Sequence, residues 1–143
     1  MLTIDASVLV AATLEDEAAS PESRELLRVA GRAGVAIHEP AIAVVEVAAG
    51  VARRTGRRDI VASSVRLLLA LPGARFHQLD VPVAVHAAGH AADLGLRAGD
   101  ALYAALAHEV GCTLVTLDRE LLERASGIVD VCTPGEWLAR QGG

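Results

Sequence analysis

Short apolar runs along the chain alternate with longer segments whose apolar residues recur every three or four positions. Runs of four or five residues rich in Val, Ile and Leu are typical of strands buried on both faces of a parallel sheet. We predict five such strands, at residues 1–5, 35–38, 76–79, 112–116 and 128–132. Pro40 is expected to stop the second strand.

The segments between these strands have the periodicity of helices with one buried face. Helices are expected at about 6–14, from Ser20 to the glycines at 31–34, at 41–54, at 82–94, 100–110 and 119–125, and from Pro134 onward. Another helix is expected after Gly56, with Val61, Val65, Leu68 and Leu69 on one face. Ser20 is expected to be the N-cap of the second helix. Leu69 is expected on the buried face of the helix that follows Gly56. Strands that alternate with helices predict an α/β domain with a parallel, doubly wound sheet.

The composition favours one domain, spanning residues 1–143, with no linker or repeat. With three aromatic residues in the chain, the core has to be built from Ala, Val and Leu. Cys112 and Cys132 lie in apolar strand-like segments without CxxC spacing, so we expect reduced core thiols. No signal peptide or membrane-spanning run is present, and we expect a cytoplasmic protein that does not enter a membrane.

Two acidic residues follow directly on predicted strands. Asp5 ends the first strand and Asp118 ends the fourth. In sheets of this class, ligands bind beyond the carboxyl ends of the strands, where the strand order reverses. Each residue has an alternative interpretation as the N-cap of the helix that follows.

Two further acids stand in apolar helices. Glu46 is the one charged residue in 40–52, and a buried carboxylate is costly unless it is protonated, paired or bound to metal. A structural ion pair with an Arg is the alternative for Glu46. Asp100 heads the apolar segment 100–107, where an N-cap is again the alternative.

Asp5, Glu46, Asp100 and Asp118 together predict one divalent-metal site. Clustered carboxylates repel one another, and a hard cation relieves that repulsion. Mg²⁺ and Mn²⁺ prefer oxygen ligands and are usually held by a few carboxylates together with substrate phosphate. Such an ion lowers the pKa of a bound water and neutralises charge on the attacked phosphate, so the expected reaction is phosphodiester hydrolysis.

Four segments also resemble a known family. They are Asp-Ala-Ser after the first strand, the lone Glu46 after the second, Gly-Asp-Ala-Leu-Tyr-Ala-Ala-Leu-Ala at 99–107 and Leu-Val-Thr-Leu-Asp-Arg-Glu-Leu at 114–121. In this order and spacing they resemble the PIN-domain nucleases. The chain length and the closing Val-Cys-Thr-Pro-Gly-Glu-Trp-Leu resemble the VapC-type toxins of toxin–antitoxin modules.

This resemblance implies a five-stranded sheet in the order 3-2-1-4-5, with the four acids around one or two Mg²⁺ or Mn²⁺ ions. It implies an endoribonuclease that cuts single-stranded regions of tRNA, rRNA or mRNA, and a homodimer silenced by a cognate antitoxin. Ser7 and Thr116 match positions that support the acids by hydrogen bonding. Glu120 stands where a fifth acid would act.

The net charge of −5 argues against attraction of nucleic acid by the whole surface, but a local group of basic residues could still bind RNA. All thirteen basic residues are Arg, which excludes any mechanism that needs a lysine. Arg53, Arg54, Arg57 and Arg58 form one concentrated patch. They could contact RNA phosphates, meet an acidic antitoxin segment, or simply form a solvated helix end.

Two histidines, His86 and His90, share a helix face as zinc ligands can, but the sequence shows no HExxH glutamate and no third ligand beside them. Among other classes, a phospho-receiver domain is disfavoured because it needs an acid pair after the first strand and a lysine. The absence of lysine, together with Asp-Ala-Ser in place of Asp-x-Asp, disfavours a phosphatase of the haloacid-dehalogenase type. A catalytically silent module that binds RNA or a protein partner remains the alternative function.

Overall fold

The computed structural model describes residues 1–142, and its centre is a five-stranded parallel sheet in the order β3-β2-β1-β4-β5. The strands are β1 (Leu2–Ile4), β2 (Ile37–Pro40), β3 (Ala74–His77), β4 (Thr113–Val115) and β5 (Val131–Cys132). The strand order reverses at β1, which pairs with β2 on one side and β4 on the other. The predicted α/β class and strand order are confirmed.

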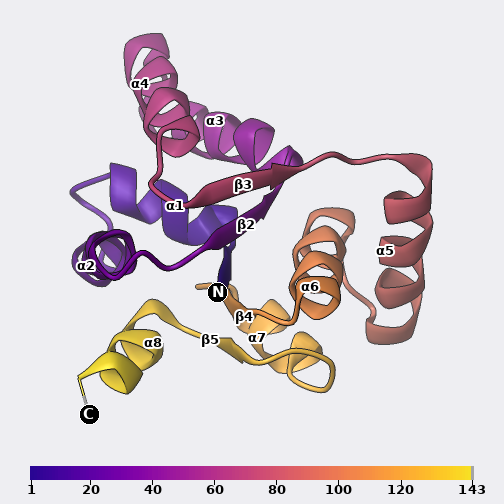
Figure 1. Cartoon of the computed structure of the whole chain (residues 1–143). Helices are drawn as coiled ribbons and strands as arrows, with labels where there is room; N and C mark the ends of the chain where they lie inside the picture. The colour runs from indigo at the N-terminus through magenta and orange to yellow at the C-terminus, as the bar shows by residue number, and fades with distance from the viewer. Residues whose placement is uncertain (143) are drawn as a thin grey trace.

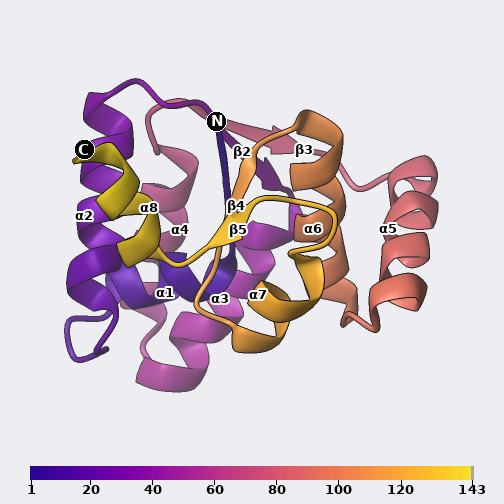
Figure 2. The same cartoon turned by 90° about the horizontal axis from the view of Figure 1, so that it is seen from below.

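Eight helices surround this sheet within the described residues. They are α1 (Ala6–Thr13), α2 (Ser20–Arg32), α3 (Ile42–Thr55), α4 (Arg58–Leu69), α5 (Val81–Leu94), α6 (Ala98–Val110), α7 (Arg119–Ala125) and α8 (Pro134–Gln141). Figure 1 shows α1 and α2 on one side of the sheet, with α6 on the other side and α5 outside it. Figure 2 shows α8 packed beside α2.

The core consists largely of small aliphatic side chains, as the composition predicts. Ile4 and Leu114 on the central strands have no exposed surface. Every residue of α6 from Ala101 to Ala107 is buried, because this helix lies between the sheet and α5. Both cysteines are buried free thiols, as predicted. No helix in the described chain combines the length and the hydropathy that a membrane span requires.

Several predicted boundaries are wrong by one to three residues, and the largest shift is in β5, which begins at Val131 and not at 128. Ser20 is the first residue of α2 and not its cap, since Ala19 occupies the cap position without a side-chain hydrogen bond. Pro40 belongs to β2 as its last residue, in register with His77, where its missing N–H is tolerated. Strand β3 begins at Ala74, two residues earlier than predicted.

The predicted inner face of α4 also needs correction. Ser64 and Leu68 are buried, but Leu69 is 56% exposed. Successive helical residues are rotated by about 100°, so a helix that buries Leu68 turns its neighbour toward solvent. The buried stripe follows the three- and four-residue spacing and leaves Leu69 outside it.

Candidate functional site

Asp5, Glu46, Asp100 and Asp118 all line one pocket. Asp5 immediately follows β1 and Asp118 lies three residues after β4, and these two strands are direct neighbours in the sheet. Glu46 comes from α3 and Asp100 from the first turn of α6. The structure therefore brings together four predicted residues that are up to 113 positions apart in the sequence, at the carboxyl edge of the sheet.

The carboxylate of Asp5 is held by one of its two oxygens. Oδ2 accepts hydrogen bonds from the Ser7 backbone N–H at 3.3 Å, from the Ser7 hydroxyl, and from the Thr116 hydroxyl at 2.9 Å. Within the described residues, Oδ1 accepts no protein hydrogen bond. Asp5 thus caps α1, as the alternative interpretation stated, and still presents a free oxygen to the pocket.

Ser7 and Thr116 also connect the ends of the two central strands. The Ser7 hydroxyl oxygen accepts from the Leu117 N–H at 3.1 Å, and the Thr116 hydroxyl oxygen accepts from the Asp118 N–H at 3.0 Å. Each hydroxyl therefore donates to Asp5 and accepts from the segment that leads to Asp118. These bonds fix the two carboxylates relative to each other.

Asp118 divides its two oxygens in a similar way. Oδ1 accepts from the backbone N–H groups of Glu120 and Leu121 at 2.8 and 3.2 Å, so Asp118 caps α7. Oδ2 accepts from the Arg97 guanidinium at 2.7 Å. Its side chain is 30% exposed, and Asp118 lines the pocket together with Arg97.

Asp100 is not a helix cap, which rules out its alternative interpretation. Arg97 occupies the N-cap position of α6, and Asp100 lies in the first turn. The Arg97 side chain donates to Asp100 Oδ2 at 3.0 Å as well as to Asp118. Arg97 is therefore a cationic bridge between two of the four acids, and the sequence analysis did not identify it.

Glu46 is half-buried against α6. A β-carbon added to Gly99 would overlap Glu46 Oε1, so the absence of a side chain at Gly99 makes room for this carboxylate. No Arg or Lys lies within ion-pair distance of Glu46 among the described residues, which removes the alternative of a structural ion pair. Gly99 is thus a second site residue that sequence reasoning did not single out.

The acids of the pocket disfavour one another's ionisation. Burial raises the pKa of Glu46, and the negative charges of Asp5 and Asp100 raise it further. Burial likewise raises the pKa of Asp100; the adjacent Arg97 counters this rise, whereas Asp5 and Asp118 add to it. Both shifts show that the folded protein holds negative charge here at a cost, as expected of a cation site.

Glu39 is a further carboxyl group that the sequence analysis missed. It lies on β2, has no exposed surface, and accepts the backbone N–H of Ile4 at 3.0 Å through Oε1. Its Oε2 has no hydrogen-bond partner in the described part of the chain. Burial raises the pKa of Glu39 well above its ordinary value.

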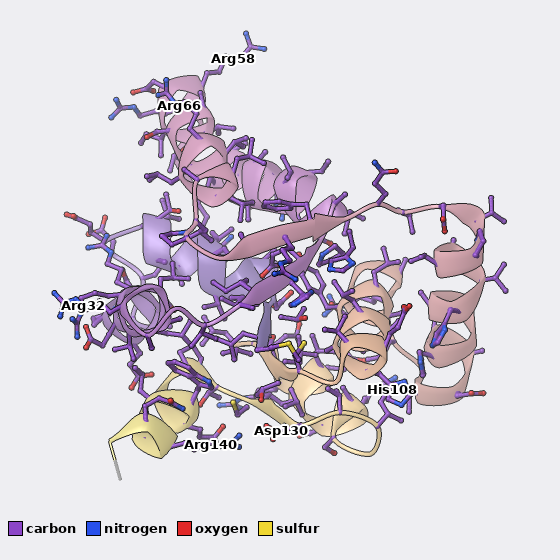
Figure 3. All side chains as sticks on the ribbon, in the orientation of Figure 1. Arg32, Arg58, Arg66, His108, Asp130 and Arg140 are labelled. Atoms are coloured by element: carbon purple, nitrogen blue, oxygen red, sulfur yellow. The ribbon has the colours of Figure 1, made fainter. Side chains whose placement is uncertain are left out.

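The predicted Arg patch is split by the turn between α3 and α4. Arg53 and Arg54 line the acidic pocket, and Arg54 also pairs with Glu17 at 2.6 Å. Arg57 instead pairs with Asp59. Figure 3 shows Arg58 at the tip of α4, pointing away from the body of the protein. The patch is therefore two separate features, and the half on α3 belongs to the pocket.

Glu120, expected as a possible fifth acid, is exposed and lies outside the lining of the pocket. Its carboxylate pairs with Arg124 at 2.9 Å, one turn away on α7. The second contact, to the Arg97 guanidinium, is longer at 4.0 Å. Glu120 is therefore not one of the acids that line the pocket.

Comparison with known proteins places this pocket in a family context. A family model described as the PIN domain matches residues 2–127. No curated protein matches the sequence. PAE2754 from Pyrobaculum aerophilum is 26% identical over 97% of this chain and 94% of its own, with a TM-score of 0.67.

Two further solved structures show the same fold. VapC20 from Mycobacterium tuberculosis is 17% identical over 92% of this chain and 98% of its own, with a TM-score of 0.74. FitAcB from Neisseria gonorrhoeae is 24% identical over 94% and 99%, with a TM-score of 0.69. The family model spans most of the chain and includes all four acids of the pocket. The chain therefore belongs to the PIN-domain family.

Proposed function

We propose that this PIN-domain protein is a metal-dependent endoribonuclease and the toxin of a toxin–antitoxin module. The observation that carries the proposal is the meeting of Asp5, Glu46, Asp100 and Asp118 in one pocket at the switch point of the sheet. The pocket presents oxygen ligands to a cation, and Arg side chains stand at its edge for a phosphate.

The donor set fits Mg²⁺ or Mn²⁺. Asp5 Oδ1 is free of protein hydrogen bonds in the described residues, while Oδ2 fixes its direction through Ser7 and Thr116. The raised pKa values of Glu46 and Asp100 mean that a bound cation would relieve an existing repulsion. When bound, such an ion supplies a Lewis acid that polarises a phosphate and acidifies a water.

The chain itself supplies orientation and charge. Ser7 and Thr116 hold the Asp5 carboxylate and prevent it from rotating away from the pocket. Arg53 lines the pocket, and no ion pair engages it among residues 1–142. Its guanidinium can therefore contact the RNA backbone, because a guanidinium presents two parallel donors to phosphate oxygens. A single strand suits an open pocket at a sheet edge.

The structural relatives support the biological role. VapC20 is named as a toxin that cleaves the sarcin-ricin loop, and another relative is a toxin–antitoxin complex from Klebsiella pneumoniae. For this chain we propose an RNA substrate, a cognate antitoxin and a homodimer. Exposed apolar side chains on and before α5, Leu79, Val81 and Val85, support a protein partner at that surface.

The decisive experiment measures RNA cleavage by the antitoxin-free protein. We expect cleavage with Mg²⁺ or Mn²⁺, none in EDTA, and loss of at least about 100-fold in Asp5→Asn. Asp16→Asn is the matched control, since Asp16 is an exposed acid outside the pocket and should behave as wild type. Undiminished cleavage in EDTA by a preparation free of other ribonucleases would refute the metal mechanism.

The alternative function, a catalytically silent module that binds RNA or a protein, makes a different prediction. Such a protein would bind single-stranded RNA without cutting it under any metal condition, and Asp5→Asn would leave binding unchanged. All four acids are present and share a pocket, which favours the nuclease. Measuring RNA binding and cleavage on the same preparations separates the two functions.

A further inference from the structure

A second cluster of potential ligands lies away from the acidic pocket, between α5 and α6. His86 and His90 are one turn apart on α5, and His108 is in the last turn of α6. One ligand nitrogen from each of the three side chains lies within 4.8 Å of the other two. Figure 3 labels His108 on α6, where it faces the end of α5. The third ligand that the sequence did not reveal is therefore present.

Two of the three imidazoles already have a spacing close to that of metal ligands, and the third lies beside them. The Nε2 atoms of His86 and His90 are 3.1 Å apart, and the ring centroids of His90 and His108 are 5.4 Å apart. In a tetrahedral zinc site with Zn–N bonds of about 2.0–2.1 Å, ligand nitrogens are about 3.4 Å apart. The pair on α5 meets this spacing, and a side-chain rotation of the exposed His108 would complete it.

The three side chains are also free of competing ionic partners. Among the described residues, none of them forms an ion pair with a carboxylate. Their ring nitrogens are therefore available to a metal, which binds imidazole through a nitrogen lone pair.

We propose that His86, His90 and His108 bind one zinc ion that fastens α5 to α6. Three nitrogen ligands select an ion such as Zn²⁺, whereas the oxygen ligands of the acidic pocket select Mg²⁺ or Mn²⁺. The two sites are thus distinguished by ligand chemistry as well as by position. Water would occupy the remaining coordination position of the zinc ion, because His86 and His108 are exposed.

The helix that this ion would fasten is weakly held without it. Ala87 is the one fully buried residue in α5, and Val81 and Val85 are 74% and 67% exposed. In the described chain α5 packs mainly against α6. A zinc ion coordinated by both His90 and His108 would therefore link α5 directly to α6, the helix against which it mainly packs. Because α6 also carries Asp100, the link would steady the helix behind the acidic pocket.

The test measures zinc binding in a background that lacks the acidic site. Asp5→Asn together with Asp100→Asn removes two carboxylates from that pocket, and a chromophoric chelator then reports the zinc bound in competition. We expect one zinc ion per chain. His86→Ala or His108→Ala in the same background should weaken zinc binding by at least about tenfold.

The matched control is His77→Ala. The His77 ring lies 2.9 Å from the His38 ring through Nε2 and Nδ1, so this is also a histidine pair, but one without a third histidine in the metal cluster. Its replacement should leave zinc binding unchanged. Equal zinc binding after His86→Ala and His108→Ala, or no zinc binding in the background, would overturn the proposal.

A thermal measurement on the otherwise unaltered chain covers the case in which the background variant does not fold. With excess Mg²⁺ present to fill the oxygen site, zinc at about 100 times its dissociation constant should raise the Tm by roughly 5–10 °C. His108→Ala should abolish this rise, and His77→Ala should keep it. A rise that persists in His108→Ala would also overturn the proposal.

Discussion

The substitution Gly99→Ala tests whether RNA cleavage depends on the position of the Glu46 carboxylate. A β-carbon at this position would overlap Glu46 Oε1, so in Gly99→Ala the carboxylate has to move by about 1 Å. The displaced atom is at the end of a flexible side chain, so the protein can accommodate the change without unfolding. A misplacement of about 1 Å in a catalytic group costs about 100-fold in rate, which is the loss we expect.

Gly89 on α5 is the matched control, because a β-carbon there meets no atom within 4 Å. Replacing a glycine in a helix by alanine stabilises the helix by about 0.5–1 kcal/mol, which corresponds to a Tm increase of about 1–4 °C in a domain of this size. Gly89→Ala should therefore melt higher and cleave RNA at the wild-type rate.

Cleavage rate and Tm are to be measured on both variants with the same RNA and Mn²⁺ concentration. We expect Gly99→Ala to keep a Tm close to that of the wild type while losing activity. The reasoning is refuted if Gly99→Ala cleaves at the wild-type rate, since the position of Glu46 would then not matter. A large fall in Tm would show instead that the site cannot adapt as the structure indicates.

Three other predictions use the same assays. Asp5→Asn should raise the Tm of the metal-free protein, because it removes one of the charges that raise the pKa of Glu46 and Asp100; a lower Tm would make Asp5 chiefly a helix cap. Folding raises the pKa of Glu46 and Asp100, so in EDTA their protonated forms should stabilise the folded protein fully below the ordinary pKa values of 4.5 and 3.8. This stabilisation should be lost as the pH rises through the pKa values of the folded state. The difference in Tm between wild type and Glu46→Gln, measured against pH, should follow that loss. Arg53→Ala should weaken RNA binding and reduce the slope of log K against log[salt] by about one, whereas Arg58→Ala should do neither. If Arg58→Ala instead weakens antitoxin binding, Arg58 contacts the antitoxin.

The acids that were identified from the sequence can be recognised from the apolar residues next to them. Asp5 and Asp118 follow apolar strands, and Glu46 interrupts an apolar helix, so each is visible from its immediate neighbours. Topology then determines that they meet, because parallel strands end at the same edge of a sheet. The convergence of the acids was predictable for this reason, although their individual hydrogen bonds were not.

The residues that were missed depend on contacts between distant segments. Gly99 matters because the Glu46 side chain, from α3, lies against it. Arg97 lies in the short connection between α5 and α6, where no periodicity marks it, and it bridges two acids 18 positions apart. Glu39 lies outside the predicted strand because that strand was ended before Pro40, two residues too early. His108 joins the histidines of α5 through the packing of two helices.

Capping a helix and binding a metal are compatible roles for Asp5 and Asp118, both of which cap helices in the structure. A carboxylate has two oxygens with about four lone-pair sites, so one oxygen can cap a helix while the other faces a pocket. At Asp5 the outward oxygen is free in the described residues, whereas at Asp118 it accepts from Arg97. The capped helix start fixes the backbone, and the fixed backbone directs the second oxygen.

Arg97 offsets part of the negative charge of the acidic pocket, because it pairs with both Asp100 and Asp118. Arg53 and Arg54 also line the pocket, although Arg54 pairs with Glu17. The Arg97 side chain is 65% exposed and can swing away, because no buried contact holds its guanidinium. Asp100 and Asp118 would then be available to hold a divalent cation, and the Arg97 guanidinium would be available to an RNA phosphate. We therefore expect the arginines at the pocket, rather than the overall charge of −5, to govern RNA binding.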